Sequence, residues 1–285
     1  MIERKKICIM AKTYPTLSEK YDELVCTAGL LEDGSWIRIY PLPFRKLEYD
    51  QRYKKYQWIE ADVERNTADV RVESYKIFNI ETLKKLGTIG TEHAWSKRNA
   101  LVFKLQKVYT NLEELISISR ATNISLAIFK PTRVLDFVWE DVEREWPKEK
   151  LEAIKAKASQ SSLFQSPEEI ARELQFVRKL PYRFSYVFED DSGKRSTLMA
   201  EDWEVGMLYW TCLEAAHGDE TQALKKVRQK CFDHFIRDTD LHFFMGTTKA
   251  YHGWSSNPFI IVGLYYPPRK TQLEFVFDRG IAYAP

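Results

Sequence analysis

The stretch that decides the fold reads Cys26-Thr-Ala-Gly-Leu-Leu-Glu-Asp-Gly-Ser-Trp-Ile-Arg-Ile-Tyr-Pro41. It predicts two short strands that are joined by a turn at Asp33-Gly34. Trp36, Arg38 and Tyr40 follow one another at a spacing of two residues, which places their side chains on one face of a strand. Because aromatic rings stack on bases and Arg contacts phosphates, we expect this face to bind nucleic acid rather than to fill a dry core.

Further basic and aromatic side chains extend this pattern on both sides. The candidate contacts to nucleic acid outside the stretch are Lys12, Tyr14, Arg45, Lys46 and Lys55. Aromatic rings contribute about 1–3 kcal/mol each by stacking on bases, while Lys and Arg follow the phosphates. The alternative interpretation is that Trp36 and Tyr40 fill the interior of a barrel, and that Arg38 is an ordinary surface charge.

The composition is that of a globular chain with little overall charge. Its 285 residues, 44% hydrophobic and 29% charged, are enough for the cores of two or three domains. The net charge of +2 means that any basic surface must be local. Four scattered cysteines without a Cys-x-x-Cys pair argue against a metal or disulfide framework. With no membrane-spanning run and no signal-peptide pattern, we predict a cytoplasmic protein that has no membrane partner and needs no cofactor.

The order of the expected elements predicts an α+β protein in three parts. Residues 1–140 hold many short strands, among them Leu101–Val108, and predict one or two OB-like barrels. Residues 141–180 alternate acidic and basic side chains and predict a helical connector. Residues 181–285 predict an α+β domain with two helices and an antiparallel sheet that ends in a strand at Leu273–Phe277.

A long loop from Gly246 to Pro258 is a second candidate for binding. It carries a cation, an imidazole and an indole at Lys249, His252 and Trp254. Long loops with polar and aromatic side chains are often functional, although an ordinary connection explains the same residues equally well.

A set of acidic side chains and one imidazole raises an enzymatic alternative. The side chains that can converge on a divalent metal are Asp202, Glu204, Asp238, Asp240 and His242. Asp202 and Glu204 stand where a helix is expected to begin, and acidic residues are favoured there in any case. Because no recognised catalytic motif is present, the sequence supports no particular reaction.

The first half of the chain also resembles a known family at four places. They are the opening strand that ends in Lys12, Cys26-Thr-Ala-Gly29, Trp36-Ile-Arg38 and Phe129-Lys-Pro131. On these motifs, residues 1–140 resemble the dual OB-containing domain of bacterial proteins encoded near mobile-element or defence genes. Members of that family usually run from the Arg directly into a proline, whereas Ile39 and Tyr40 intervene here. The resemblance implies two OB-like barrels and a role in nucleic-acid binding.

The second half resembles an uncharacterised domain of bacterial defence-type proteins at Asp202-Trp-Glu204 and Phe244-Met-Gly-Thr247. Residues and resemblances together predict a non-catalytic nucleic-acid-binding protein of a bacterial defence or DNA-processing system. Its expected partners are DNA or RNA and a protein of the same system. Two alternatives stay open. One is a metal-dependent nuclease that uses the carboxylates of the second half, and the other is an adaptor that binds another protein through the long loop.

Overall fold

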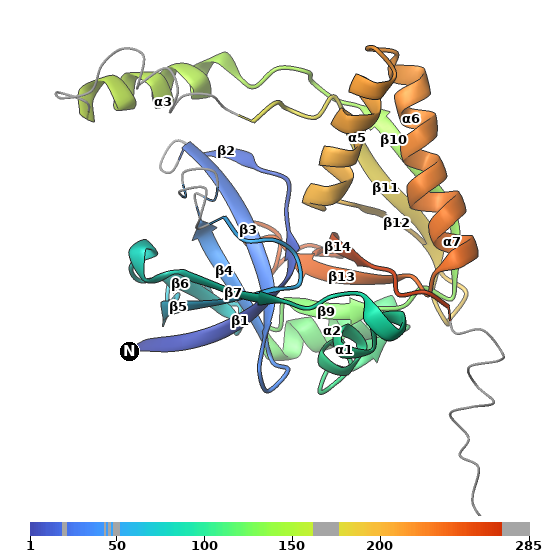
Figure 1. Cartoon of the computed structure of the whole chain (residues 1–285), viewed down its shortest axis with the longest axis horizontal. Coiled ribbons are helices and arrows are strands. Elements are labelled where there is room, and N and C mark those ends of the chain that lie inside the picture. Colours follow the sequence, from blue (N-terminus) through green and yellow to red (C-terminus); the bar gives the residue numbers. More distant parts are fainter. Residues whose placement is uncertain (19–21, 43, 45–46, 48–51, 162–176, 270–285) are drawn as a thin grey trace, which may run out of the picture.

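The structure is a computed structural model that describes residues 1–18, 22–42, 44, 47, 52–161 and 177–269. It is an α+β protein, as the sequence predicts, in which a β-rich first half packs against two further sheets and their helices (Figure 1). Three predicted features lie outside the described residues: Arg45 with Lys46, the connector from residue 162 to residue 176, and the strand Leu273–Phe277. In the described ranges, no helix is long and apolar enough to cross a membrane.

Five strands of the first half close into a barrel. They are β1 (Ile2–Lys12), β3 (Asp22–Leu31), β4 (Trp36–Leu42), β5 (Gln57–Arg65) and β6 (Ser74–Ile77). The pairing order is β1-β3-β4-β6-β5, and β5 pairs again with β1, which closes the ring. β4 and β6 run parallel, and the other pairs are antiparallel. Three short elements extend the barrel: β2 (Thr16–Ser18) on β3, β7 (Lys84–Thr88) on β5, and the 3-10 helix η2 (Ile80–Thr82).

The strands of the barrel bury both of their faces. Ile7 and Ile9 point into the barrel and pack with Ile37 and Ile39, whereas the intervening Cys8 belongs to a second core outside the barrel. The turn predicted at Asp33-Gly34 is confirmed. Gly34 has a φ of +90°, where glycine carries no steric penalty. The outer face of the barrel is therefore a packing surface over much of its area.

The rest of the chain forms two sheets with helices. The four-stranded sheet contains, in this order, β14 (Phe259–Tyr265), β13 (His242–Thr247), β9 (Leu126–Phe129) and β8 (Val108–Tyr109). The three-stranded sheet contains, in this order, β10 (Arg133–Asp141), β11 (Tyr182–Glu189) and β12 (Arg195–Met199). The helices are α1 (Glu92–Val102), α2 (Leu112–Thr122), α3 (Lys148–Ser161), α5 (Trp203–Ala215), α6 (Glu220–Arg228), the π-helix η3 (Gln229–His234) and α7 (Phe235–Asp238). β9 pairs with β13 and β10 pairs with β11, so strands before residue 142 complete sheets whose other strands follow residue 181.

One predicted strand is wrong. Leu101 and Val102 end α1, and only Val108 of the segment Leu101–Val108 belongs to a strand. A short apolar run fits a buried helix end as well as a strand, so hydrophobicity alone does not separate the two. Of the one or two barrels expected, the described part of the chain contains a single closed one.

Candidate functional site

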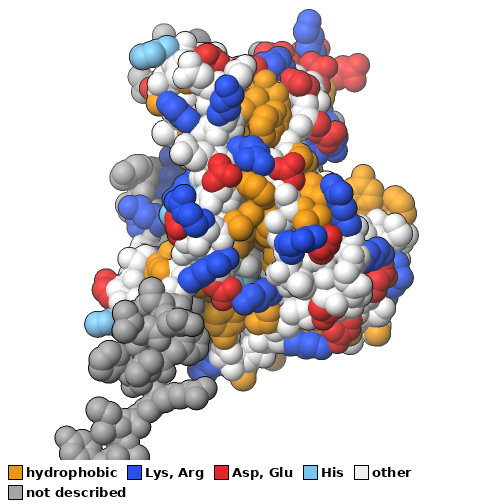
Figure 2. Space-filling model, turned by 90° about the vertical axis from the view of Figure 1, so that its right-hand side faces the viewer, with side chains coloured by type: hydrophobic (Ala, Val, Ile, Leu, Met, Phe, Trp, Pro, Cys, Tyr) orange, Lys and Arg blue, Asp and Glu red, His pale blue; other side chains and the backbone are white. Residues whose placement is uncertain are grey.

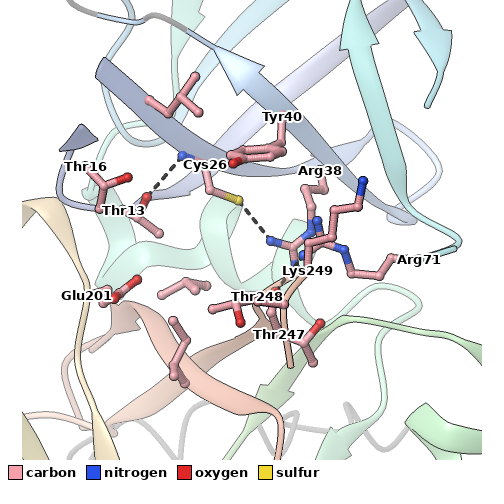
Figure 3. A pocket seen from close by; sticks show the side chains of 14 residues that line it. Thr13, Thr16, Cys26, Arg38, Tyr40, Arg71, Glu201, Thr247, Thr248 and Lys249 are labelled. Atoms are coloured by element: carbon pink, nitrogen blue, oxygen red, sulfur yellow. Dashed lines mark hydrogen bonds between the residues drawn. The ribbon is translucent and has the colours of Figure 1, made fainter. Parts of the chain in front are cut away.

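A pocket of about 490 Å³ lies where the barrel meets the four-stranded sheet. The barrel supplies its wall from β3 and β4, and the other wall comes from β14 and from the start of the long loop after β13 (Figure 3). The lining residues are Thr13, Thr16, Leu24, Cys26, Arg38, Tyr40, Arg71, Glu201, Thr247, Thr248, Lys249, Ala250, Ile260 and Val262. The pocket therefore draws on segments from most of the length of the chain.

Arg38 is the central cation of this pocket. Its side chain leaves β4 on the outer face of the barrel and is only 2% exposed. One terminal nitrogen, Nη1, donates to Cys26 Sγ at 2.9 Å, and Nη2 donates to the carbonyl and hydroxyl oxygens of Ser125 at 3.0 and 3.1 Å. Ser125 N donates in turn to Glu73 at 2.8 Å. The Nε of Arg38 is buried and has no hydrogen-bond partner among the described residues.

Arg71 supports the same end of the pocket. Its Nε and Nη2 donate to the two oxygens of Asp69 at 2.9 and 2.6 Å, and its Nη1 donates to Thr247 O at 2.7 Å. Burial alone would raise the pKa of Asp69, but the hydrogen bonds from Arg71 and Ser74 outweigh it and hold that pKa below its usual value. Arg71 is thus paired, and it fastens the segment before β6 to the end of β13.

The long loop contributes a cation beside the two arginines. Lys249 is exposed, and its Nζ donates to Ala68 O at 2.7 Å. The hydroxyl of Thr248 is buried without a partner among the described residues. His252 is not among the residues that line the pocket, and its Nδ1 is 2.9 Å from Oγ1 of Thr247, which does line it. Burial, and next the charge of Arg71, lower the pKa of His252, so the imidazole is neutral at neutral pH.

The opposite end of the pocket is polar without being cationic. Figure 3 shows Arg38 and Lys249 on one side, and Glu201 with Thr13 on the other. Burial raises the pKa of Glu201. Its side chain receives no hydrogen bond from any residue in the described part of the chain. Tyr40, the third member of the predicted Trp36–Arg38–Tyr40 face, lines the pocket between these two ends.

The structure corrects the prediction that Trp36 and Arg38 form an open stacking face. Trp36 is 8% exposed, and its ring packs edge-on against the ring of Phe244 of β13, with 5.6 Å between the ring centres. The face of β4 that carries Trp36, Arg38 and Tyr40 does point away from the barrel interior, but the four-stranded sheet covers most of it. The alternative interpretation is also incorrect, because Trp36 fills a core outside the barrel and Arg38 is not a surface charge.

Three other predicted contacts lie between the barrel and α5. The hydroxyl of Tyr14 donates to Arg178 O at 2.7 Å and accepts from Trp210 Nε1 at 2.8 Å. Lys12 Nζ lies 4.2 Å from the centre of the Phe44 ring, and burial lowers its pKa to about 8. These side chains are engaged in packing the two halves together.

Lys55 is the third of these contacts. Its Nζ donates to Leu264 O at 2.7 Å and lies 3.6 Å from Asp202. Burial alone would lower the pKa of Lys55, but attraction to Asp202 outweighs it and raises that pKa above its ordinary value. Lys55 is therefore held as a cation inside the protein.

On the long loop, Trp254 differs from the buried His252 in being 73% exposed. Its ring lies 5.2 Å from that of Tyr251, which is itself 50% exposed. These two rings stand on the loop that also carries Lys249 into the pocket.

The five side chains of the metal alternative occupy three separate places. Asp202 and Glu204 lie beside Lys55, with Asp202 as the N-cap of α5. Asp238 lies 2.6 Å from His234 Nδ1, and Asp240 pairs with Lys130 at 2.9 Å. His242 Nε2 is 3.9 Å from Asp240. In the described ranges, no three His, Cys, Asp or Glu side chains are grouped as a metal site requires.

Sequence reasoning missed several residues of the pocket. Arg71, Glu201 and Thr248 are not among the predicted site residues, and Cys26 is predicted only as part of a strand and of the motif Cys26-Thr-Ala-Gly29. Arg71 has no neighbouring motif, and Glu201 directly precedes Asp202-Trp-Glu204, whose acidic residues the sequence assigns to a helix start or to a metal site. Thr248 was available as the neighbour of Lys249, so the polar content of the long loop was the one usable signal.

Comparison with known proteins identifies a family but no activity. Residues 3–104 match the Domain of unknown function (DUF8758), and residues 108–280 match the Domain of unknown function (DUF8757). The second match spans more than half of the chain, so the chain belongs to the DUF8757 family. Comparison with curated proteins finds no match.

Among solved structures, a murine DNA-binding protein bound to double-stranded DNA aligns with 94% of this chain and 97% of its own, at 6% identity and a TM-score of 0.29. A TM-score this low does not establish a common fold.

Proposed function

We propose that this protein is a non-catalytic nucleic-acid-binding protein, and that the nucleic acid binds at the pocket on the outer face of β3 and β4. The observation that carries the proposal is the convergence of Arg38 and Lys249 on a pocket that also offers an aromatic wall, Tyr40. Cations for phosphates and rings for bases are the two elements that binding of single strands requires.

The barrel supports the proposal through its topology. We assign it to the OB type, because it consists of five closed strands, with β3 and β4 second and third along the chain. The face of the second and third strands is where OB barrels bind oligonucleotides. Here the four-stranded sheet covers much of that face, so binding is confined to the pocket and its rim.

The distribution of charge favours a local site over a general basic surface. On the face that carries α6 and α7, basic and acidic side chains are interspersed (Figure 2). At the pocket, Lys249 stands on the same loop as the exposed rings of Tyr251 and Trp254. Exposed aromatic area beside a cation suits stacking of bases next to a bound phosphate.

The experiment is a fluorescence-anisotropy titration with mixed-sequence single-stranded DNA, single-stranded RNA and duplex DNA. We expect binding at low salt that weakens as salt is added, because phosphate contacts release counterions. Lys249→Ala and Trp254→Ala should weaken binding. Lys226→Ala, which removes an exposed cation from α6, is the matched control and should not. Absence of binding to all three nucleic acids at low salt would refute the proposal.

The finer assignments rest on resemblance alone. A role in a bacterial defence or DNA-processing system, and a partner protein of the same system, are proposals of this kind. The adaptor alternative stays a prediction as well. The nuclease alternative draws no support from the carboxylates, because Asp202, Asp238 and Asp240 lie apart.

A further inference from the structure

We propose that the pocket holds one nucleotide, with its phosphate at Arg38 and Lys249 and with its base between Tyr40 and the wall formed by Ile260 and Val262. This inference rests on the proposed function and specifies the unit that is bound. The pocket volume of about 490 Å³ lies in the range of small-molecule sites, so it suits one nucleotide and not a folded strand.

The end of the pocket that carries Arg38 and Lys249 can bind an anion. Arg38 is almost fully buried, yet its Nε donates to no residue in the described part of the chain. The buried hydroxyl of Thr248 beside it also lacks a partner in that part. A buried donor without an acceptor costs free energy, which a phosphate oxygen placed there would recover. Lys249 adds a second positive charge at the same end.

Arg71 strengthens this end indirectly. It is paired with Asp69, so it adds little net charge, but its bond to Thr247 O holds the start of the long loop in place. Gly246 lets β13 pass close to Val262 of β14, since a Cβ at this position would lie 2.7 Å from a methyl carbon of Val262. The anion site is thus formed before a ligand arrives.

The middle of the pocket suits a flat ring. Tyr40 offers an aromatic surface from β4, and Ile260 and Val262 offer branched aliphatic side chains from β14. Figure 3 shows Tyr40 between the cationic end and the end that carries Glu201. A nucleobase bound in this slot would be stacked on one face and packed against methyl groups on the other.

The far end can recognise the edge of the base. Glu201 is fixed by its backbone, since its N donates to Ile261 O and its O accepts from Tyr14 N, both at 2.8 Å. Its side chain accepts no hydrogen bond in the described part of the chain, and burial raises its pKa. A carboxyl group in this position accepts from an exocyclic amino group, which adenine, cytosine and guanine carry and uracil and thymine lack. We therefore expect preference for the amino-bearing bases.

The first arm of the test uses isothermal titration calorimetry with the four ribonucleoside 5′-monophosphates, their nucleosides and inorganic phosphate. Monophosphates with an amino-bearing base should bind about tenfold more tightly than uridine monophosphate, and more tightly than any nucleoside or phosphate alone. Equal affinity for all four monophosphates, or phosphate binding as tightly as a nucleotide, would overturn the inference.

Two variants locate the contacts. Glu201→Gln should reduce the preference among bases, and Tyr40→Leu should weaken all four monophosphates. Glu152→Gln on α3, an exposed carboxylate away from the pocket, is the matched control. Thermal unfolding of each variant separates loss of binding from loss of fold. If Glu201→Gln does not fold, Tyr40→Leu still decides the question, and unchanged affinities in a folded Tyr40→Leu protein count against the inference.

The second arm distinguishes a free nucleotide from one unit of a strand. A thymidine strand with one central deoxycytidine is compared with the same strand carrying an abasic unit there. Tighter binding of the deoxycytidine strand supports the inference that the pocket holds one nucleotide of a strand. Equal binding of both strands overturns the single-nucleotide inference but leaves the proposed function standing. Binding of monophosphates without binding of any strand supports the inference with a free nucleotide as ligand, and overturns the proposed function.

Discussion

Breaking the buried pair of Lys55 and Asp202 should destabilise the protein strongly. The side chains are 7% and 2% exposed, and the Nζ lies 3.6 Å from the carboxylate. The same carboxylate accepts from Glu204 N and from Leu264 N, both at 2.9 Å. Lys55→Met leaves the Asp202 carboxylate buried and unpaired, so it should lower the free energy of unfolding by about 3–5 kcal/mol. Asp202→Asn leaves Lys55 with the half-exposed Glu204 carboxylate at 3.1 Å, so its cost should be smaller, about 1–3 kcal/mol.

The variant with both substitutions tests the pairing of Lys55 and Asp202 more directly than either single variant. Asp202→Asn keeps a good helix cap for Glu204 N, so its cost comes mainly from the lost pair and from the orphaned Leu264 N. In Lys55→Met with Asp202→Asn, neither charge is left behind. The double variant should therefore be more stable than the sum of the single changes predicts, by about 1–3 kcal/mol.

The assay is chemical unfolding followed by tryptophan fluorescence and by circular dichroism, with the dependence on denaturant compared across the three variants. Lys55 lies in the segment that matches the first family and Asp202 in the segment that matches the second, so the coupling also reports how the two halves pack. Single changes that each cost less than about 1 kcal/mol, or that simply add, would show that water reaches the pair and that this reasoning is wrong.

Three further predictions concern other parts of the molecule. Trp36→Ala should lower the free energy of unfolding by about 3–5 kcal/mol, since it empties a core position, whereas Trp254→Ala at an exposed position should stay within about 0.5 kcal/mol. Burial lowers the pKa of Lys12 from 10.5 to about 8, so between about pH 8 and pH 10 the unfolded chain binds more protons than the folded chain. The free energy of unfolding should therefore rise with pH in this range. Denaturant titrations at pH 7 and pH 10 should find that wild type gains stability relative to Lys12→Met as the pH rises. Incubation of DNA or RNA with magnesium or manganese should yield no cleavage products on a gel, and products that disappear in Asp240→Asn would establish the nuclease alternative.

Local features of the chain were readable without the structure. The spacing of Trp36, Arg38 and Tyr40 predicts that these side chains share one face of a strand, and Asp33-Gly34 predicts the turn between β3 and β4. Both predictions are confirmed, because side-chain direction and turn geometry depend on neighbouring residues only. An Asp that is followed three residues later by a Gln is also typical of a helix start, and Asp219 caps α6 by accepting from Gln222 N at 3.0 Å.

Which strand faces are exposed could not be predicted from the sequence. A spacing of two residues places Trp36, Arg38 and Tyr40 on one face, but the spacing is the same whether that face meets solvent, a ligand or another sheet. Phe244 of β13 reaches Trp36 across more than two hundred residues of sequence. Long-range packing of this kind has no local signature, so the burial of Trp36 could not be predicted.

The candidate site depends on the same long-range packing. Arg38 was predicted from its strand and Lys249 from its loop, each without the other. The pocket exists because β14 and the long loop lie against β3 and β4, which brings Arg38, Lys249 and Glu201 around one cavity. Chemistry-bearing side chains could be recognised from their type and spacing, but their convergence is a property of how the barrel and the second sheet pack, and no periodicity in the chain encodes it.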